Sequence, residues 1–343
     1  MKNCPSELGM YFKELLKKHS VSGLALAKIE DSQLVWADGF GFANTTQRTL
    51  VFADTIFEAA SLSKPVVAFA TLQLCKNQKL NLNDTLAKYL DWDFDSRITV
   101  KHVLTHTSGL ANWIEENENP QPQFTPGSRF SYSGVGYRVL QEAIEKITNQ
   151  PLEQYLNETL FTQLEMQNSS FTWRSDFAEK YATGHDTNGL PIEKFQPNKA
   201  FAAFSLHSTV SDLSKFVIAF LKSHLRTQML EPHVIVNNTV PWKKDWSRDN
   251  FEEFLSVFWG LGWGLEQTKN EQFFWQWGNN GNFKAFALTS SSTGNGFIAL
   301  TNGANGDRLW RELTDKLVGG EHPLLNWLEQ TEAIPSFGES DRI

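Results

Sequence analysis

Hydrophobic positions near the start of the chain recur first at helical and then at strand spacing. Leu8, Phe12 and Leu15 lie three or four residues apart, which predicts a short amphipathic helix. The segment from Gly23 to Gly41 contains two apolar runs around a polar turn at Asp31-Ser32-Gln33, which predicts a hairpin. We therefore expect the chain to open with one helix and two strands.

A similar pattern returns near the other end of the chain. The apolar runs FKAFALTS and GFIALTN are separated by the turn-forming residues Ser292 to Asn295. A helix is predicted after these strands, with four apolar residues on one face: Leu309, Trp310, Leu313 and Leu317. Strands at both ends of the chain predict one antiparallel sheet closed by the two chain ends.

Between these strands the pattern is mainly helical. Apolar periodicity and helix-start signals predict five helices: Ser61–Cys75, Thr99–His106, Gly136–Thr148, Pro151–Leu160 and Ser211–Lys222. Strands that enclose a run of helices predict an α/β fold, in which an antiparallel sheet flanked by helices carries an inserted, mainly helical lobe. The aromatic stretch from Trp242 to Trp263 has no clear period and is assigned no element.

The chain is expected to form a single domain over residues 1–343. The sheet region is expected at about 1–80 and 200–343, and the helical lobe at about 81–199. A binding or catalytic site is expected at the seam between these two parts.

Composition narrows the range of partners. Hydrophobic residues make up 41% of the 343 residues and charged residues 20%, which is typical of a globular protein, and the net charge is -8. A net negative chain offers no basic surface for phosphates, so no nucleic-acid partner is expected. Cys4 and Cys75 form no metal-type pair, and neither a metal nor another cofactor is expected.

Targeting signals are absent from the pattern. No run of 18 apolar residues occurs, and the first 20 residues lack the apolar stretch of a secretory signal, so no membrane span is expected. The expected compartment of the chain as given is the cytoplasm, or the periplasm or exterior if a signal peptide has been removed. The sequence leaves the oligomeric state open.

The strongest chemical signal is Ser61-Leu62-Ser63-Lys64 at the start of a predicted helix. If the helix begins at Ser61, Lys64 lies one turn further on the same face. A serine hydroxyl needs a base to become nucleophilic, and a desolvated lysine can lose its proton and serve as that base. A Ser-x-x-Lys motif alone is common by chance. The simplest alternative to a catalytic pair is a serine that caps the helix and a lysine that points into solvent.

Two further motifs strengthen this interpretation. Tyr132, in FSYSGVGY, precedes a periodic helix, and a phenol near cations can be shifted toward phenolate and relay a proton. Gln276-Trp277-Gly278-Asn279 is predicted at the start of the penultimate strand, where Gly278 would let an edge strand approach a substrate. The N–H groups of Asn279 and Ser61 would then form an oxyanion hole.

The order and flanks of these motifs resemble the serine β-lactamase and penicillin-binding protein family, specifically its class C branch with related esterases and D-amino-acid peptidases. The likeness extends over nearly the whole chain, in segments that include DTIFEAASLSKPVVAFATLQL, TVKHVLTHTSGL, FSYSGVGY and QWGNNGNFKAF. The resemblance implies that Ser61 is acylated, that Lys64 and Tyr132 share the acid and base roles, and that water deacylates the enzyme.

Three positions depart from the family pattern. Gly134 replaces an asparagine that typically contacts a substrate amide, and Asn282 replaces a common glycine. Gln276 replaces a lysine or histidine, and a neutral amide cannot supply a cation to a substrate carboxylate. Gly134, Gln276, Trp277 and Gly278 are therefore the expected substrate-binding residues.

These departures favour a serine hydrolase acting on a small ester, amide or peptide over an efficient β-lactamase. A β-lactamase and a D-amino-acid peptidase remain alternatives within the enzyme class. A different class is a catalytically impaired penicillin-binding-like protein with a binding or assembly role.

Other residues have simpler interpretations. His106 and His102 are expected to be structural, since the chain lacks a Gly-x-Ser-x-Gly elbow and HVLTH lacks the glutamate of HExxH metalloproteases. Asp54 is expected to cap or brace the approach to the serine helix. Three tryptophans are candidates for lining an apolar acyl pocket: Trp113, Trp275 and Trp277.

Overall fold

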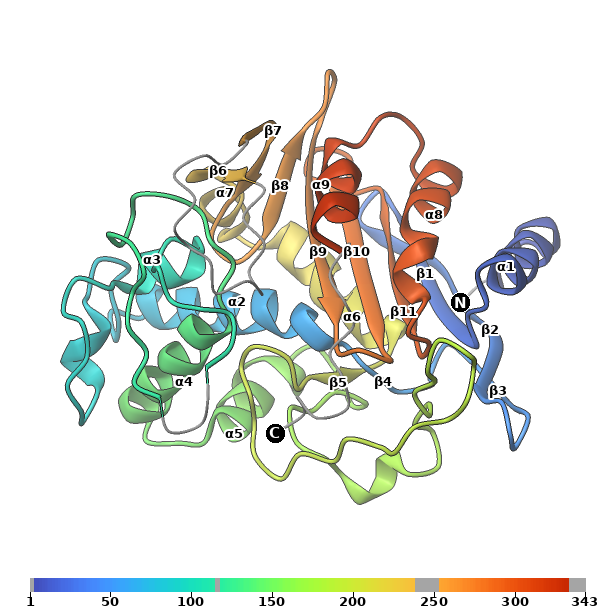
Figure 1. Cartoon of the computed structure of the whole chain (residues 1–343), viewed down its shortest axis with the longest axis horizontal. Coiled ribbons are helices and arrows are strands. Elements are labelled where there is room, and N and C mark those ends of the chain that lie inside the picture. Colours follow the sequence, from blue (N-terminus) through green and yellow to red (C-terminus); the bar gives the residue numbers. More distant parts are fainter. Residues whose placement is uncertain (1–2, 115–117, 238–252, 333–343) are drawn as a thin grey trace.

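The largest element of the fold is an antiparallel sheet. The computed structural model describes residues 3–114, 118–237 and 253–332, and within them nine strands lie in the order β3-β2-β1-β11-β10-β9-β8-β7-β6 (Figure 1). The strands are β1 (Gly23–Glu30), β2 (Gln33–Asn44), β3 (Thr49–Leu50), β6 (Val234–Asn237), β7 (Glu253–Trp259), β8 (Gly264–Gln267), β9 (Gln272–Asn279), β10 (Lys284–Ser290) and β11 (Gly296–Thr301).

The first and last strands along the chain, β1 and β11, are neighbours in the middle of this sheet. β1 pairs with β11 from Leu24 opposite Thr301 to Ile29 opposite Gly296, and β2 pairs with the other edge of β1. This confirms the predicted hairpin and the predicted sheet that joins the two chain ends. The predicted FKAFALTS and GFIALTN strands are β10 and β11.

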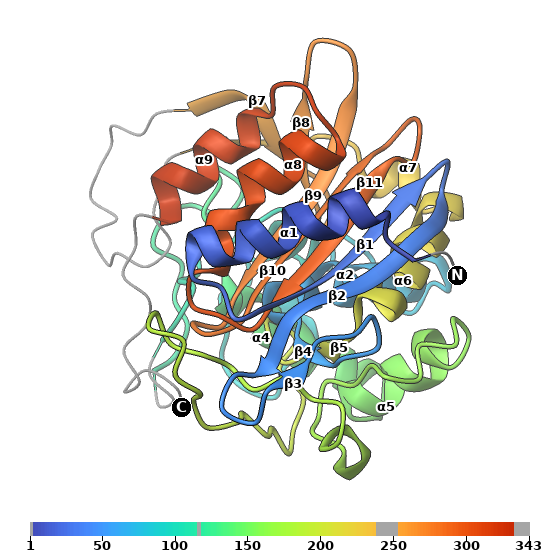
Figure 2. The same ribbon diagram turned by 90° about the vertical axis from the view of Figure 1, so that its right-hand side faces the viewer.

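The helices cover both faces of the sheet. They are α1 (Ser6–His19), α2 (Ser63–Lys76), α3 (Val100–Leu104), α4 (Gly134–Thr148), α5 (Leu152–Leu156), α6 (Val210–Lys222), α7 (Arg226–Met229), α8 (Trp310–Leu317) and α9 (Pro323–Glu332). Figure 2 shows α1, α8 and α9 across one face, with α2 and α6 behind the sheet. In the described residues, no helix has both the length and the apolar character needed to cross a bilayer.

Successive residues of the central strands enter two different cores. Leu24 and Leu26 of β1 pack into the cluster that includes α1, α8 and α9 residues. Ala25 and Ala27 pack into the cluster that includes α2 and α6 residues. Because side chains alternate across a strand, a sheet covered on both faces needs continuous apolar runs, as in LALAKI.

The serine helix begins later than predicted. Ala60–Leu62 forms a 3₁₀ turn and α2 begins at Ser63, so Ser61 lies in the turn before the helix. The other predicted helices are present with shifted ends, and α5 continues into a π-helical turn at Asn157–Phe161. Pro65 has no N–H to donate, which fits its place in the first turn of α2.

The helices α3, α4 and α5 lie together beyond α2 from the large sheet (Figure 1). Outside the large sheet, a small two-stranded sheet pairs β4 (Phe57–Glu58), before α2, with β5 (His207–Ser208), after α5. The division into a sheet region and an inserted helical lobe at about 81–199 stays a prediction. Of the aromatic stretch that received no element, residues 242–252 lie outside the described residues, and its described part consists of β7 and the four residues between β7 and β8.

Candidate active site

Ser61 lies next to a sharp bend in the backbone. Ala60 has a φ of 48°, in the left-handed region that residues with a side chain rarely adopt. The hydroxyl of Ser63 holds the bend, because it donates to the Ala60 carbonyl at 2.6 Å and accepts from the Leu206 N–H at 3.0 Å. Ser61 itself is half-buried, so its hydroxyl is presented at the end of a backbone that the core holds in place.

Lys64 reaches back from α2 to the serine. Its Nζ donates to Ser61 Oγ at 3.0 Å and to the Ala203 carbonyl at 2.8 Å. The side chain is 2% exposed, and burial lowers the pKa of Lys64 to about 7, because desolvation disfavours the ammonium form. The structure thus places an amine that loses its proton near neutral pH within hydrogen-bond distance of a serine hydroxyl.

Tyr132 completes this group. Its phenol hydrogen bonds with the Ser61 side chain and accepts from Gln276 Nε2 at 3.0 Å. Burial raises the pKa of Tyr132, and these two hydrogen bonds only partly offset the effect. The expected shift toward phenolate is therefore wrong, because a neutral amide stands beside the phenol and the buried phenol keeps its proton.

His106 fixes the position of Tyr132. The His106 carbonyl accepts from the Ser131 N–H at 2.7 Å, and His106 Nδ1 accepts from the Ser133 N–H at 3.0 Å. The ring centres of His106 and Tyr132 lie 4.2 Å apart. Since Nδ1 accepts, the imidazole is neutral with its proton on Nε2, and burial lowers the pKa of His106 well below its usual value. These contacts are those of a structural residue.

Two other residues singled out in the sequence make local contacts. His102 and Thr99 exchange side-chain and backbone hydrogen bonds at the start of α3. Asp54 is exposed and pairs with Lys180, whose Nζ lies 3.3 Å from the Asp54 carboxylate. In the part of the chain that the structure describes, no group of three or more His, Cys, Asp or Glu side chains is placed to hold a metal ion.

The third motif lies at the end of a strand. The sequence predicted Gln276–Asn279 at the start of the penultimate strand, but the motif ends β9, where it pairs with β10 and extends past the end of β8 opposite Trp275. The reason is the tight turn after Asn279, in which Gly281 has a φ of 76°. A Cβ at Gly278 would lie 2.9 Å from both the Ala59 carbonyl and the Ala60 Cβ, so glycine is what lets β9 approach the serine turn.

The backbone N–H of Asn279 points away from β10. Asn279 pairs with Lys284, and the next residue, Asn280, donates its N–H to the Phe283 carbonyl at 3.0 Å. Because N–H groups alternate between the two edges of a strand, that of Asn279 faces the β8 side. β8 pairs with β9 only as far as Trp275. The N–H of Asn279 therefore lies on the part of the β9 edge that extends beyond β8, beside the Ala60–Leu62 turn that contains Ser61.

Gln276 and the tryptophans are more enclosed than a substrate-binding role suggests. Gln276 is fully buried, and its Nε2 also donates to the Trp277 carbonyl at 2.8 Å. Trp275 lies wholly in the core, so its expected place in an acyl pocket is wrong, and Trp277 is 6% exposed with its ring 4.5 Å from that of Tyr132. Trp113 is 43% exposed and therefore offers an accessible aromatic surface.

Two groups that contact the predicted site residues Lys64 and Gly134 were not found in the sequence. One is the Ala203 carbonyl, which holds Lys64 and carries no side-chain signal. The other is Asn112, which packs beside Gly134 at the start of α4. The nearby HTSGL sequence marks a loop, but which of its residues would face the serine depends on packing that the sequence does not encode locally.

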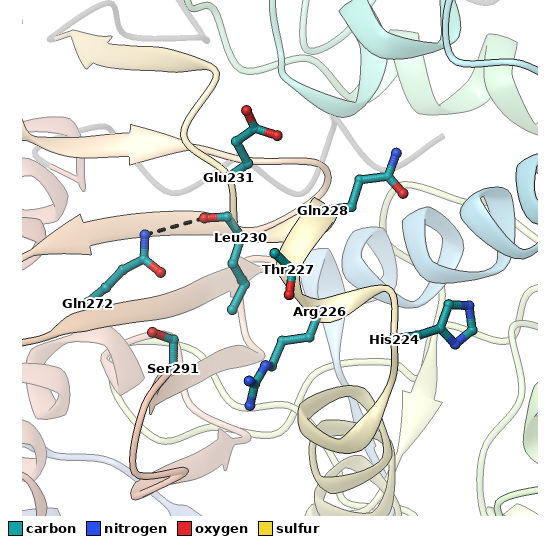
Figure 3. A pocket seen from close by; sticks show the side chains of 8 residues that line it. All are labelled: His224, Arg226, Thr227, Gln228, Leu230, Glu231, Gln272 and Ser291. Atoms are coloured by element: carbon teal, nitrogen blue, oxygen red, sulfur yellow. Dashed lines mark hydrogen bonds between the residues drawn. The ribbon is translucent and has the colours of Figure 1, made fainter.

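A separate surface depression lies at the opposite end of β9 (Figure 3). It is lined by His224, Arg226, Thr227, Gln228, Leu230, Glu231, Gln272 and Ser291. Gln272 Nε2 donates across it to the Leu230 carbonyl at 3.3 Å. None of the predicted site residues contributes to this depression.

Two solved structures share the fold of this chain. A β-lactamase/D-alanine carboxypeptidase from Pseudomonas syringae has a TM-score of 0.77 with this structure at 17% identity, and the match covers 93% of this chain and 99% of that one. An octameric penicillin-binding protein homologue from Pyrococcus abyssi has a TM-score of 0.76 at 23% identity, covering 93% and 78%. Both matches show a fold that this chain shares with those two proteins.

The chain belongs to the beta-lactamase family, whose model matches residues 10–318. Protein flp of Staphylococcus aureus strain MW2 is 23% identical over 310 residues, which are 84% of this chain and 61% of that protein. Penicillin-binding protein 4* of Bacillus subtilis strain 168 is 27% identical over 250 residues, 62% of this chain and 55% of its own length. This chain thus spans less than two thirds of the curated relatives that it matches.

Proposed function

We propose that this chain is a serine hydrolase that forms an acyl-enzyme on Ser61 with small ester or amide substrates and releases the acyl group with water. The observation that carries the proposal is the buried Lys64 Nζ at 3.0 Å from Ser61 Oγ, with its pKa lowered to about 7. A neutral amine at that distance can accept the serine proton, which is the requirement for making the hydroxyl nucleophilic.

In the acylation step, Ser61 Oγ attacks the substrate carbonyl while its proton passes to Lys64. The resulting ammonium keeps its hydrogen bond to the Ala203 carbonyl. The carbonyl oxygen of the substrate becomes negative and is stabilised by the N–H groups of Ser61 and Asn279. Tyr132 donates its proton to the leaving alcohol or amine, and the Lys64 proton then restores the phenol.

Deacylation uses Lys64 as the base a second time. Water attacks the carbonyl carbon of the Ser61 ester and passes a proton to Lys64, which gives a tetrahedral intermediate. When this intermediate collapses, the carboxylic acid leaves and Ser61 Oγ takes the proton back from Lys64. Two residues with matched tasks are thus required: a base that is neutral near pH 7 and an acid that is protonated there. The opposite pKa shifts of Lys64, to about 7, and of Tyr132, upward, support this assignment.

The substrate class follows from charge. Gln276 stands where related proteins carry lysine or histidine, and it supplies no cation to a carboxylate. We therefore propose neutral esters and amides over carboxylate-bearing β-lactams or peptides with a free C-terminal carboxylate. The D-alanine carboxypeptidase named for the Pseudomonas syringae relative is the activity that this argument disfavours.

Covalent labelling tests the proposal. A fluorophosphonate is expected to add one mass increment to the intact chain and to map to Ser61, and Ser61→Ala is expected to remain unlabelled. Ser63→Ala is the matched control, because it removes a neighbouring hydroxyl that already binds the Ala60 carbonyl. Absence of labelling in a folded protein, together with no turnover of short-chain p-nitrophenyl esters, would instead identify a penicillin-binding-like protein with a binding or assembly role.

A further inference from the structure

The side-chain amine of Lys64 has more N–H donors than the surrounding residues have acceptors for it. A protonated lysine carries three donors. Its Nζ donates to Ser61 Oγ and to the Ala203 carbonyl, and the described residues offer it no third acceptor. Burial is the cause of the lowered Lys64 pKa, and no carboxylate of these residues offsets it. The ammonium form therefore needs a partner of another kind.

Two tyrosine rings lie beside this amine. Lys64 Nζ lies over the ring of Tyr132, 4.8 Å from the ring centre, and over the ring of Tyr137, 5.7 Å from the ring centre. The face of a phenol ring carries partial negative charge and attracts a cation within about 6 Å, more strongly in a buried site than in water. Both rings therefore favour the ammonium form of Lys64, against the effect of burial.

His106 is a further titratable group beside these rings. Its ring centre lies 4.2 Å from that of Tyr132 and 5.6 Å from that of Tyr137. The imidazole is neutral, because Nδ1 accepts from the Ser133 N–H, so it adds no charge. Burial raises the pKa of both tyrosines, and the phenols therefore stay neutral as well. The tyrosine rings thus act on Lys64 through their faces and not through a charge.

The Tyr137 ring is held in place without the use of its hydroxyl. The hydroxyl is buried and has no hydrogen-bond partner among the described residues. It lies against Gly262, where an added Cβ would come within 3.5 Å of the phenol oxygen and 2.2 Å of the Ala68 Cβ. The Gly262 N–H donates to the Leu104 carbonyl at 2.9 Å, which fixes this loop beside α2 and α4. The site therefore uses the ring of Tyr137, and the hydroxyl is dispensable.

We propose that Tyr137 is a positioning residue for proton transfer: the face of its ring, together with that of Tyr132, binds the Lys64 ammonium and sets the pH at which the free amine becomes available. In the acylation step this amine takes the Ser61 proton, so the ring stabilises the positive charge that forms there. The effect on turnover rests on the proposed acylation of Ser61, whereas the effect on the ionisation of Lys64 does not.

A fluorine series tests the ring face at nearly constant shape. Tyr137→Phe keeps the ring and removes the unpaired hydroxyl, so it is expected to leave the Lys64 pKa unchanged and to keep or raise the melting temperature. Replacing this phenylalanine by its fluoro, difluoro and trifluoro forms then withdraws negative charge from the ring face step by step. The Lys64 pKa is expected to fall with each fluorine, by about half a pH unit over the series.

NMR measures this ionisation directly. In a chain whose lysines carry carbon-13 at Cε, the signal that Lys64→Met removes belongs to Lys64, and its titration near pH 7 is separate from that of exposed lysines at about pH 10.4. The same fluorinated residues at Phe69 are the control, because Phe69 is buried in α2 against Phe216 and Phe220. A Lys64 pKa that does not fall along the Tyr137 series, or that falls equally along the Phe69 series, would overturn the proposal.

Turnover gives a second, separate measurement. A less basic amine is free at lower pH but is a weaker base, so the pH profiles of kcat/KM for p-nitrophenyl butyrate are expected to cross. The trifluoro variant should be slightly faster than Tyr137→Phe at the acid end and slower at the alkaline end, which damage to the fold would not produce. No turnover in any variant, with the NMR shift present, would refute the hydrolase activity alone. Turnover with an unshifted Lys64 would refute the role of Tyr137 alone.

Discussion

The side-chain amide of Gln276 donates a 3.0 Å hydrogen bond to the phenol oxygen of Tyr132. Since a neutral donor replaces a cation at this position, it does little to stabilise a phenolate, and burial raises the pKa of Tyr132. Lys64, whose pKa is lowered to about 7, is then left as the base of the resting site. Because Gln276 on β9 is neutral, Tyr132 is assigned as the acid and Lys64 as the base. Four predictions follow from this assignment and from the packing around the site.

The pH dependence of acylation should follow Lys64. With its pKa near 7, the amine is protonated and inactive below that pH and is free to accept the Ser61 proton above it. We expect kcat/KM for p-nitrophenyl butyrate, measured from pH 5.5 to 9, to rise about tenfold per pH unit at the acid end and to level off above about pH 7.5. A rate independent of pH over this range would remove Lys64 from the role of base.

Introducing a cation at Gln276 should change substrate selection. Gln276→His or Gln276→Lys is expected to lower KM for carboxylate-bearing substrates such as nitrocefin by about tenfold, because a charge-assisted hydrogen bond becomes available. KM for the neutral p-nitrophenyl butyrate should change little. Gln272→His, at the opposite end of β9, is the matched control. Equal effects of the two histidine variants on nitrocefin would contradict the role of this position.

Removing the buried amine should stabilise the fold. The pKa of Lys64 is about 7 in the folded chain and near its usual 10.5 in the unfolded chain, so the unfolded state binds more protons between these values. Below pH 10.5, this difference costs the wild type about 1.4 kcal/mol per pH unit down to pH 7. Lys64→Met is therefore expected to raise the free energy of unfolding, by denaturant titration, most at pH 7 and progressively less toward pH 10.5. A gain that did not change with pH would point to packing instead.

Adding one methyl group at two glycines should have opposite effects. Gly134→Ala places Cβ 2.7 Å from the Asn112 carbonyl oxygen, and we expect it to destabilise the fold by about 1–3 kcal/mol and to lower esterase activity by moving Tyr132. Gly9→Ala, in α1, places Cβ at an ordinary 3.6 Å from the Phe40 ring and should stabilise by up to about 1 kcal/mol. Thermal melts of both variants check this contrast, and a neutral Gly134→Ala would show that the loop yields.

The parts of the fold that the sequence predicted have a local period or a local turn. α1 has a single buried face with Phe12 and Leu15, and the β1–β2 hairpin has its turn at Asp31 and Ser32, which both adopt positive φ. β9 was misplaced because both of its faces are buried, so no alternation marks where the strand begins. The start of α2 was misplaced because the bend at Ala60 depends on contacts with distant Leu206.

The part of the candidate site that the sequence predicted consists of side chains that lie close together in the sequence. Ser61 and Lys64 are three residues apart, and the Nζ to Oγ contact follows from that spacing even with the helix starting late. The Ala203 carbonyl and Asn112 lie in loops far along the chain, and only the packing of those loops brings the first to Lys64 and the second to Gly134. The neutral state of Tyr132 likewise follows from how deeply it is buried.

The pairing of β1 with β11 also bears on the order in which the molecule is made. Gly23–Glu30 leaves the ribosome before its hydrogen-bonding partner, Gly296–Thr301, which is synthesised more than 250 residues later. Until then one edge of the opening hairpin is unpaired and able to bind other strands. Completion of the sheet, and with it the support for β9 beside Ser61, therefore waits until β11 has been synthesised, so nascent fragments are expected to depend on chaperones.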